Sequence, residues 1–260
     1  VNGWTQFRNY MEFWFGIQYN AEGTQRFETR NWVQLADGET YASIPGGGPL
    51  ISEPATYGGW WGAATDTRKS LWYRTEGNYF RDEAGNTQLF LGAGLRWNQS
   101  SAINHQIDLE YVDRRDDTQH LHNYENPGGG IGGVSYVFGD IHQRTVDLTL
   151  RSSLLFSRNS SLELYLQPYV TVGSYDRARE LVRPDSYDLE PYERDGFNAS
   201  DFDFSYSAVN LNMVYRWEYR PGSALFLVWT HARSAYDERG AFTEEPGSFR
   251  NDIRTGALFD

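Results

Sequence analysis

Two histidines stand two residues apart in the segment RRDDTQHLHNYEN, the first place where the chain could bind a metal ion. His120 and His122 would point to the same side of an extended backbone, and imidazole nitrogens are common ligands of divalent transition metals. A zinc site also needs a third ligand at a fixed spacing, which this segment does not offer. We therefore predict a solvated loop here, with metal binding kept as an alternative.

An acidic loop between residues 176 and 201 is the second place with possible metal chemistry. Calcium binds several oxygen ligands, and Asp185, Asp188 and Glu190 supply carboxylates close together in the chain. The spacing is not that of an EF-hand. The sequence predicts a hydrated surface loop and no cofactor, with Ca²⁺ in an extracellular loop as the alternative.

Residues for covalent catalysis are less clearly arranged. No Gly-x-Ser-x-Gly segment occurs, and the glycine-rich NPGGGIGG segment lacks the strand-to-helix context of a phosphate-binding loop. His142 and His231 occupy strand positions that could face an interior, and serines are plentiful. A Ser–His pair in the wall of a sheet stays open as an alternative.

The remaining charged residues alternate with apolar ones along extended segments. In VDLTLRSSLLF, Val146, Leu148 and Leu150 share one parity, whereas Asp147 and Arg151 share the other. Such a strand has one apolar face and one charged face. The charged parity of the whole chain gives a set of residues that we expect to pair across strands and to fill a narrow or occluded interior. This predicted interior charge network comprises Arg8, Glu12, Arg74, Glu76, Asp108, Glu110, Asp147, Arg151, Glu163, Arg216 and Glu218.

The period-two pattern predicts an all-β chain of about ten antiparallel strands, several longer than the five or six residues usual in soluble sheets. The connections near residues 21, 68, 100, 159 and 221 are tight and polar, and most of those between them are long. Outer-membrane β-barrels have this asymmetry. The predicted strands are Trp4–Tyr19, Thr24–Leu35, Tyr57–Thr65, Leu71–Phe80, Thr87–Asn98, Asn104–Arg114, Tyr136–Phe156, Leu162–Ser174, Phe202–Glu218 and Ala224–Ala235.

Composition agrees with a transmembrane up-and-down barrel. Aromatic residues make up 16% of the 260 residues although the mean hydropathy is −0.65, and no run of 18 apolar residues exists. Only alternate residues of a membrane β-strand meet lipid, and aromatic girdles mark both interfaces. The net charge of −12 argues against nucleic-acid binding.

We expect residues 1–260 to be a single barrel domain, but an incomplete one. If the tight turns are periplasmic, the first and last strands both end on the extracellular side, whereas such barrels begin and end in the periplasm. The sequence therefore predicts further strands before residue 1 and after residue 260, in a barrel of twelve or more strands. An open sheet edge is not tolerated in lipid.

The segment RWEYRPGS contains the most distinctive turn. Pro221 and Gly222 suit the centre of a type II turn, because Pro fixes φ and Gly accepts a positive φ. Arg216 and Glu218 would lie on the interior face, with Trp217 and Tyr219 outward at the periplasmic girdle. The turn as a whole comprises Arg216, Trp217, Glu218, Tyr219, Arg220, Pro221, Gly222 and Ser223.

Three blocks of the chain together resemble a known bacterial family. The blocks are GGGPLISEPATYGGWWGAATDTRKS, YVFGDIHQRTVDLTLRSSLLF and, most specifically, YRWEYRPGSALFLVW. They resemble the family called domain of unknown function 5916, from about Gly46 to Arg233. The resemblance implies an outer-membrane β-barrel that often follows a family-9-like carbohydrate-binding module; it supplies no catalytic residues.

The leading functional hypothesis is a non-enzymatic barrel in the outer membrane of a Gram-negative-type bacterium, acting as a channel, an anchor or a scaffold. Its expected partners are outer-membrane lipid, other outer-membrane or periplasmic subunits, and a surface glycan bound through a module that this chain lacks. One alternative is a membrane-embedded hydrolase of lipid or glycan. The other is a soluble all-β binding module.

Overall fold

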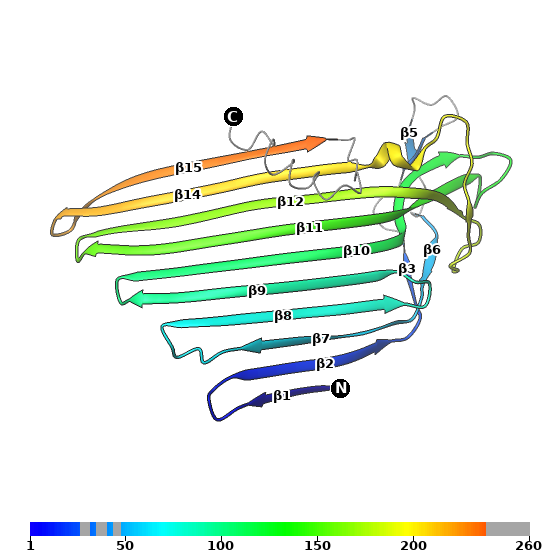
Figure 1. The fold of residues 1–260 in the computed structure, drawn as a ribbon. Helices are drawn as coiled ribbons and strands as arrows, with labels where there is room; N and C mark the ends of the chain where they lie inside the picture. The colour runs from blue at the N-terminus through cyan, green and yellow to red at the C-terminus, as the bar shows by residue number, and fades with distance from the viewer. Residues whose placement is uncertain (27–31, 35–40, 44–47, 238–260) are drawn as a thin grey trace.

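The computed structural model describes residues 1–26, 32–34, 41–43 and 48–237, and these form one large antiparallel sheet with small additions at one end (Figure 1). Ten strands follow one another in the sheet, so the prediction of an all-β chain with about ten antiparallel strands is confirmed. The sheet is not closed, because β1 and β15 lie at its two opposite edges. The ten strands, in spatial order, are β1 (Asn2–Gln6), β2 (Glu12–Asn20), β7 (Thr56–Ala64), β8 (Leu71–Asp82), β9 (Thr87–Ser100), β10 (Ile103–Glu125), β11 (Val134–Ser157), β12 (Ser160–Leu181), β14 (Phe204–Arg220) and β15 (Ser223–Asp237).

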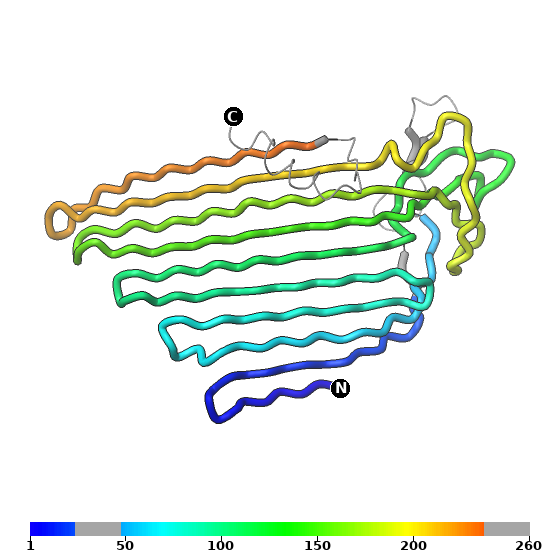
Figure 2. The backbone as a smooth tube through the Cα atoms, in the orientation of Figure 1, coloured from blue at the N-terminus to red at the C-terminus, as the bar shows by residue number. Residues whose placement is uncertain are grey.

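Tight turns and long connections lie at opposite ends of the sheet, as the alternation in the sequence predicts (Figure 2). The short elements belong to the end with the long connections, called the loop end below. There β3 pairs with β6, β4 pairs with β5 and β10, and β13 pairs with β12. These elements are β3 (Gly23–Arg26), β4 (Trp32–Gln34), β5 (Tyr41–Ser43), β6 (Leu50–Glu53), β13 (Leu189–Pro191) and the 3-10 helix η1 (Ala199–Phe202).

The registers of adjacent strands align the apolar residues into one continuous face. On β10 and β11, Ile107 lies opposite Leu150 and Leu109 opposite Leu148. The same rows continue through Leu95 on β9 and, next to Leu150, through Leu166 on β12. The other parity aligns polar residues instead. We call these two surfaces the apolar face and the polar face.

The apolar face forms a band near the tight turns. On β11 it runs from Val146 to Phe156, about ten residue steps, which is roughly 33 Å along an extended strand. At the strand tilt of about 40° found in barrels, this length corresponds to a band roughly 25 Å high, close to the apolar band of outer-membrane barrels.

The prediction for the first strand is wrong. Residues Trp4–Tyr19 form two strands, β1 and β2, joined by a turn at residues 7–11. The Phe7 backbone N–H donates to the Met11 carbonyl over 2.8 Å, and Tyr10 has a φ of 61°. The apolar alternation continues through Phe7 and Met11 into β2, so periodicity alone could not reveal the reversal.

The predicted strand Thr24–Leu35 is also absent from the wall of the sheet. Gly23–Arg26 belongs to β3 in a separate two-stranded sheet, and Trp32–Gln34 forms the short β4; the rest of the predicted strand lies outside the described residues. One predicted strand is in fact two and another is not part of the wall, so the number of wall strands is still ten. The tight turn that pairs the first two wall strands is therefore at residues 7–11 and not near residue 21.

The fully buried residues lie at the loop end. Val137 and Phe138 are neighbours on β11, so they point to opposite faces, yet they are 0% and 1% exposed. Both faces of the sheet are therefore covered there. Phe138 packs in a cluster with Ile51, Tyr136 and Leu181, which come from β6, β11 and β12.

Candidate functional site

The polar face carries a network of charges across β8, β9 and β10. Arg74 lies 3.3 Å from Glu76 on its own strand and 3.9 Å from Asp108 on β10, although β9 lies between them. The second cation is Arg96, whose Nη1 is 2.8 Å from Asp108. The predicted interior charge network did not include Arg96. Because Arg96 stands between Leu95 and Trp97, which have the apolar parity, the alternation predicts that it lies on the polar face. Gly92 and Gly94 of β9 lie between these side chains in the register and leave room for them to meet.

The same face continues over β11 and β12. Glu110 and Asp147 lie directly opposite each other, and Asp147 accepts a hydrogen bond from Gln167 Nε2 over 2.6 Å. The Arg151 guanidinium lies 5.2 Å from the Tyr165 ring centroid. A concavity of about 380 Å³ follows, lined among others by Arg96, Gln106, Arg151, Glu163, Tyr165 and Asn212.

Two residues of the predicted interior charge network, Arg8 and Glu12, lie outside the charged centre of the polar face. Arg8 is in the exposed turn between β1 and β2, so its assignment to the interior wall is wrong. The reason is the missed chain reversal at residues 7–11. Glu12 starts β2 and accepts a hydrogen bond from Gln6 Nε2 over 3.1 Å.

The RWEYRPGS segment forms the turn between β14 and β15, with Arg220 opposite Ser223. Arg216 and Glu218 pair with each other at 2.9 Å along the strand. Glu218 Oε1 also accepts a hydrogen bond from the Gly222 backbone N–H over 3.1 Å, and Gly222 has a φ of +78°.

On the apolar parity of this segment, Trp217 and Tyr219 are exposed, with ring centroids 6.1 Å apart. Pro221 sits beside Gly222 in the turn itself.

The candidate metal ligands do not converge. His120 is buried and its Nε2 lies 2.6 Å from Asn123 Oδ1, whereas the His122 ring contacts the Tyr124 ring at a tilt of 35°, with centroids 4.4 Å apart. The register shifts between the two histidines, so they do not share one side of a regular strand.

The acidic candidates are likewise apart from one another. Asp188 pairs with Arg183 at 2.7 Å, Asp185 occupies a turn with a φ of 56°, and Glu190 lies in β13 opposite Glu180. Within the described part of the chain, no three His, Asp or Glu side chains group as metal ligands.

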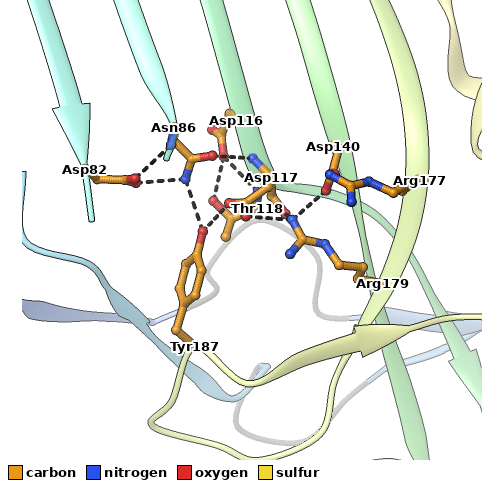
Figure 3. Close-up of polar contacts among 9 residues, drawn as sticks. All are labelled: Asp82, Asn86, Asp116, Asp117, Thr118, Asp140, Arg177, Arg179 and Tyr187. Atoms are coloured by element: carbon orange, nitrogen blue, oxygen red, sulfur yellow. Dashed lines mark hydrogen bonds and ion pairs between the residues drawn. The ribbon is translucent and has the colours of Figure 1, made fainter. Parts of the chain in front are cut away.

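A polar cluster that the sequence did not predict joins the strands at the loop end (Figure 3). Tyr187 donates a hydrogen bond from its hydroxyl to Asp117, and its oxygen accepts one from Asn86 Nδ2 over 3.0 Å. Arg179 lies 2.6 Å from Asp117 and 2.5 Å from Asp140. We call the nine residues of Figure 3 the loop-end cluster: Asp82, Asn86, Asp116, Asp117, Thr118, Asp140, Arg177, Arg179 and Tyr187.

Burial raises the pKa of the Asp117 carboxyl, but hydrogen bonds from Tyr187, Arg179 and Asn86 outweigh this effect, so the pKa lies below its usual value. Burial and the Asp117 carboxylate both raise the pKa of Tyr187. The cluster thus holds an ionised Asp117 and a protonated Tyr187 at neutral pH. This arrangement fixes the 182–188 segment to β10 and the β8–β9 connection.

The family model described as Domain of unknown function (DUF5916) matches residues 1–251. The chain belongs to this family. The resemblance seen in the sequence is thereby confirmed, and the match extends beyond the Gly46–Arg233 region of the shared blocks. No curated protein and no solved structure matches this DUF5916 chain.

One serine of this DUF5916 chain contacts a histidine side chain on the neighbouring strand. His105 Nδ1 lies 2.9 Å from Ser152 Oγ, on β10 and β11 and on the apolar face. His142 and His231 also have the apolar parity, so the structure does not place them with the charged residues of the polar face. His142 Nε2 lies 3.1 Å from Asp113 Oδ1.

None of the described helices is long and apolar enough to cross a membrane.

Proposed function

We propose that this DUF5916 chain forms the wall of a β-barrel in the outer membrane of a Gram-negative-type bacterium. The observation that carries the proposal is the apolar face, which stays in register across the nine strands from β2 to β15 of the large sheet and is exposed. Leu109 and Tyr73 are 47% and 50% exposed, and Leu91 is 40% exposed. An apolar surface of this extent is far larger than the patches that water-exposed monomers tolerate, and lipid is the solvent that suits it.

Aromatic residues at both margins of the band support the proposal that lipid covers the apolar face. Trp97, Trp217 and Tyr219 lie on the apolar parity near the tight turns. Tyr57, Tyr79 and Tyr111 lie on the same parity toward the loop end. Aromatic side chains with a polar tip prefer the two membrane–water interfaces.

The polar face would then line a hydrated interior. Mixed charges that pair across β8, β9 and β10, together with Arg151 over Tyr165, fill this face with side chains. We therefore propose a narrow or occluded interior and a non-enzymatic role as an anchor or scaffold rather than an open pore. Large stable currents in planar bilayers would contradict the occluded interior.

Closure of the wall is part of the proposal. Unpaired backbone N–H and C=O groups in hydrocarbon cost several kcal/mol each, so β1 and β15 must both find strand partners. The barrel of twelve or more strands stays a prediction, and a structure of the intact protein in detergent would test it by counting its strands.

The chain has no cysteine, which makes site-directed labelling a direct test. Single cysteines at Leu148, Thr149, Leu150 and Arg151 of the full protein in vesicles would carry a polarity-sensitive fluorophore. We expect quenching by nitroxide-labelled lipid at 148 and 150 and by iodide at 149 and 151. Quenching by lipid at none of the four positions, or full solubility without detergent, would overturn the proposal.

For the alternative function, a hydrolase, the candidate catalytic pair is His105 and Ser152. It lies on the apolar face, where an ester of a lipid could reach it, and a Ser–His pair is the minimum for nucleophilic catalysis. Hydrolysis of phospholipid or of a p-nitrophenyl ester by the protein in detergent, lost in Ser152→Ala, would favour this alternative. We expect no such activity, because the described contacts of His105 do not include a carboxylate or amide that would orient its ring.

A further inference from the structure

Two adjacent rows of polar side chains cross the polar face near the tight turns. The first row spans six strands from β8 to β14 and comprises, in strand order, Trp72, Arg96, Gln106, Arg151, Tyr165 and Asn212. The second lies nearer to the turns and comprises Asn98, Asn104, Ser153 and Glu163. All of these residues except Trp72 line the concavity of about 380 Å³, so the concavity and the side chains lie on the same face of the sheet.

Two aromatic rings position the two guanidinium groups of the concavity. Arg96 Cζ lies 5.6 Å from the Trp72 ring centroid, and Arg151 Cζ lies 5.2 Å from that of Tyr165. The Tyr165 hydroxyl donates to Gln167 Oε1 over 2.6 Å, which fixes the ring in turn. A guanidinium held against a ring by a cation–π contact can still present its N–H groups to a ligand.

Arg151 and Glu163 carry opposite charges but do not pair with each other. They stand on adjacent strands, because Tyr165, two residues from Glu163, lies opposite Arg151. Within the described residues, neither forms an ion pair within 4.0 Å. Arg96, in contrast, is neutralised by Asp108 at 2.8 Å. The concavity therefore has almost no net charge, yet it offers both a cationic donor and an anionic acceptor.

These groups suit an uncharged ligand that is rich in hydroxyl groups. A hydroxyl both accepts and donates, so neighbouring hydroxyls of one ligand can bind the N–H groups of Arg151 and the carboxylate of Glu163. The carboxamides of three asparagines and Gln106 add further donors and acceptors, and Tyr165 and Val214 add apolar surface for C–H groups. An anionic ligand would face Glu163 and a cationic ligand would face Arg151, and like charges at contact are unfavourable.

We propose that the concavity between β9 and β14 binds a sugar ring of a neutral oligosaccharide. Arg151 donates to the ring hydroxyls, Glu163 accepts from them, and Tyr165 contacts the C–H groups. Its volume is within the range of about 300–1,000 Å³ that is usual for small-molecule sites. This binding activity goes beyond the role of a wall. It requires only a hydrated polar face, and it is independent of whether lipid covers the apolar face.

The test is a calorimetric titration of the full protein in a polyoxyethylene detergent, whose headgroup contains no sugar. The probes are maltohexaose, cellohexaose and laminarihexaose, with sulfate and tetramethylammonium as the charged comparisons. We expect saturable binding of at least one hexasaccharide and no binding of either ion. Absence of binding by all three hexasaccharides, or saturable binding of either ion in their place, would overturn the proposal.

Substitutions in the concavity should weaken the binding of the hexasaccharide. Arg151→Gln and Glu163→Gln should each reduce its affinity about tenfold, because each removes charge-assisted hydrogen bonds. Tyr165→Ala should have a similar effect, and Tyr165→Phe should restore most of the affinity because the ring remains.

Tyr169→Ala is the matched control. Tyr169 has the same parity on the same strand, β12, lies opposite Asp147 and does not line the concavity. Its affinity should equal that of the unmodified protein. Equal loss in this control, or unchanged affinity in the double variant of Arg151→Gln and Glu163→Gln with a native circular dichroism spectrum, would exclude the site. Failure of the membrane proposal would appear separately, as an absence of lipid quenching at residues 148 and 150.

Discussion

The two ends of the sheet are built on different principles. In the half near the tight turns, β10 and β11 pair from Ile103 to Asp116 without a register shift, and the apolar side chains are exposed. In the loop-end half, the register shifts twice between Asp116 and His122, and side chains such as Phe138 and Leu121 are almost fully buried. The half near the tight turns is a regular sheet whose apolar side chains are exposed. The loop-end half buries its apolar side chains in an interior of its own.

The contacts that hold the two halves also differ in range along the chain. Cross-strand pairs near the tight turns join residues that a hairpin already brings together. At the loop end, Tyr187 contacts Asp117 and Asn86, which are 70 and 101 residues away. The regular half is therefore stable through repetition of a local pattern, and the loop end through a few specific long-range contacts. This difference leads to four predictions.

The largest effect is expected from Phe138→Ala. Phe138 is 1% exposed and packs with Ile51, Tyr136 and Leu181, so its truncation leaves a cavity and should lower the free energy of opening of the loop end by about 3–5 kcal/mol. Amide hydrogen exchange should accelerate in residues 134–138 and 178–181 but not in residues 146–154. Uniform acceleration along the whole of β11 would show that the two halves unfold as one unit.

The next largest effect is expected from Ile107→Arg on the apolar face, where Ile107 lies opposite Leu150. If lipid covers this face, an arginine near the middle of the band should lower the free energy of unfolding in bilayers by about 2–3 kcal/mol, as measured by urea titration. Thr149→Arg is the control at similar depth on the polar face, with an expected change below about 1 kcal/mol. Equal effects of both substitutions would remove the distinction between the faces.

A smaller effect is expected from the loop-end cluster and should depend on pH. Because the folded-state pKa of Asp117 is lowered, its contribution is fully present above the unfolded value of about 3.9 and is lost as pH falls through the folded value. Asp117→Asn should cost about 2 kcal/mol of local stability at pH 7 and little below pH 3, measured by hydrogen exchange of residues 182–188. A cost that does not change with pH would contradict the ionised state of Asp117.

The smallest effect is expected in the RWEYRPGS turn. Gly222 has a φ of +78°, and an alanine there should cost about 1 kcal/mol through backbone strain. Gly23→Ala is the control, since that position has open space for a Cβ and no positive φ. Thermal unfolding in detergent should separate the two variants; a larger loss in the control would mean that the turn contributes less than its geometry indicates.

Much of the wall was predictable because alternation is a local property. The strands from β7 to β15 follow period-two patterns, and parity alone assigns Asp108, Glu110 and Asp147 to one face. The same rule failed at Phe7–Met11, where the pattern continues through a reversed turn, and it consequently misplaced Arg8. The cue that could have revealed the turn is Asn9, whose Oδ1 accepts from the Met11 backbone N–H over 3.2 Å.

The loop-end cluster could not be predicted, since its members share no spacing in the chain. Asp117 lies in a strand bulge and Tyr187 in a long connection, and only the three-dimensional path brings them into contact. The same applies to Arg151 and Glu163, which line one concavity because β11 and β12 pair in one particular register.

The sequence by itself determined the wall strands from β7 onward, their two faces and the family, because each of these depends on residue types at short, regular intervals along the chain. Only the tertiary structure decided which charges meet, where the chain reverses at its first hairpin, and that the loop end has a buried interior. Those outcomes depend on strand register and on contacts between residues distant in the chain, and no local pattern encodes either.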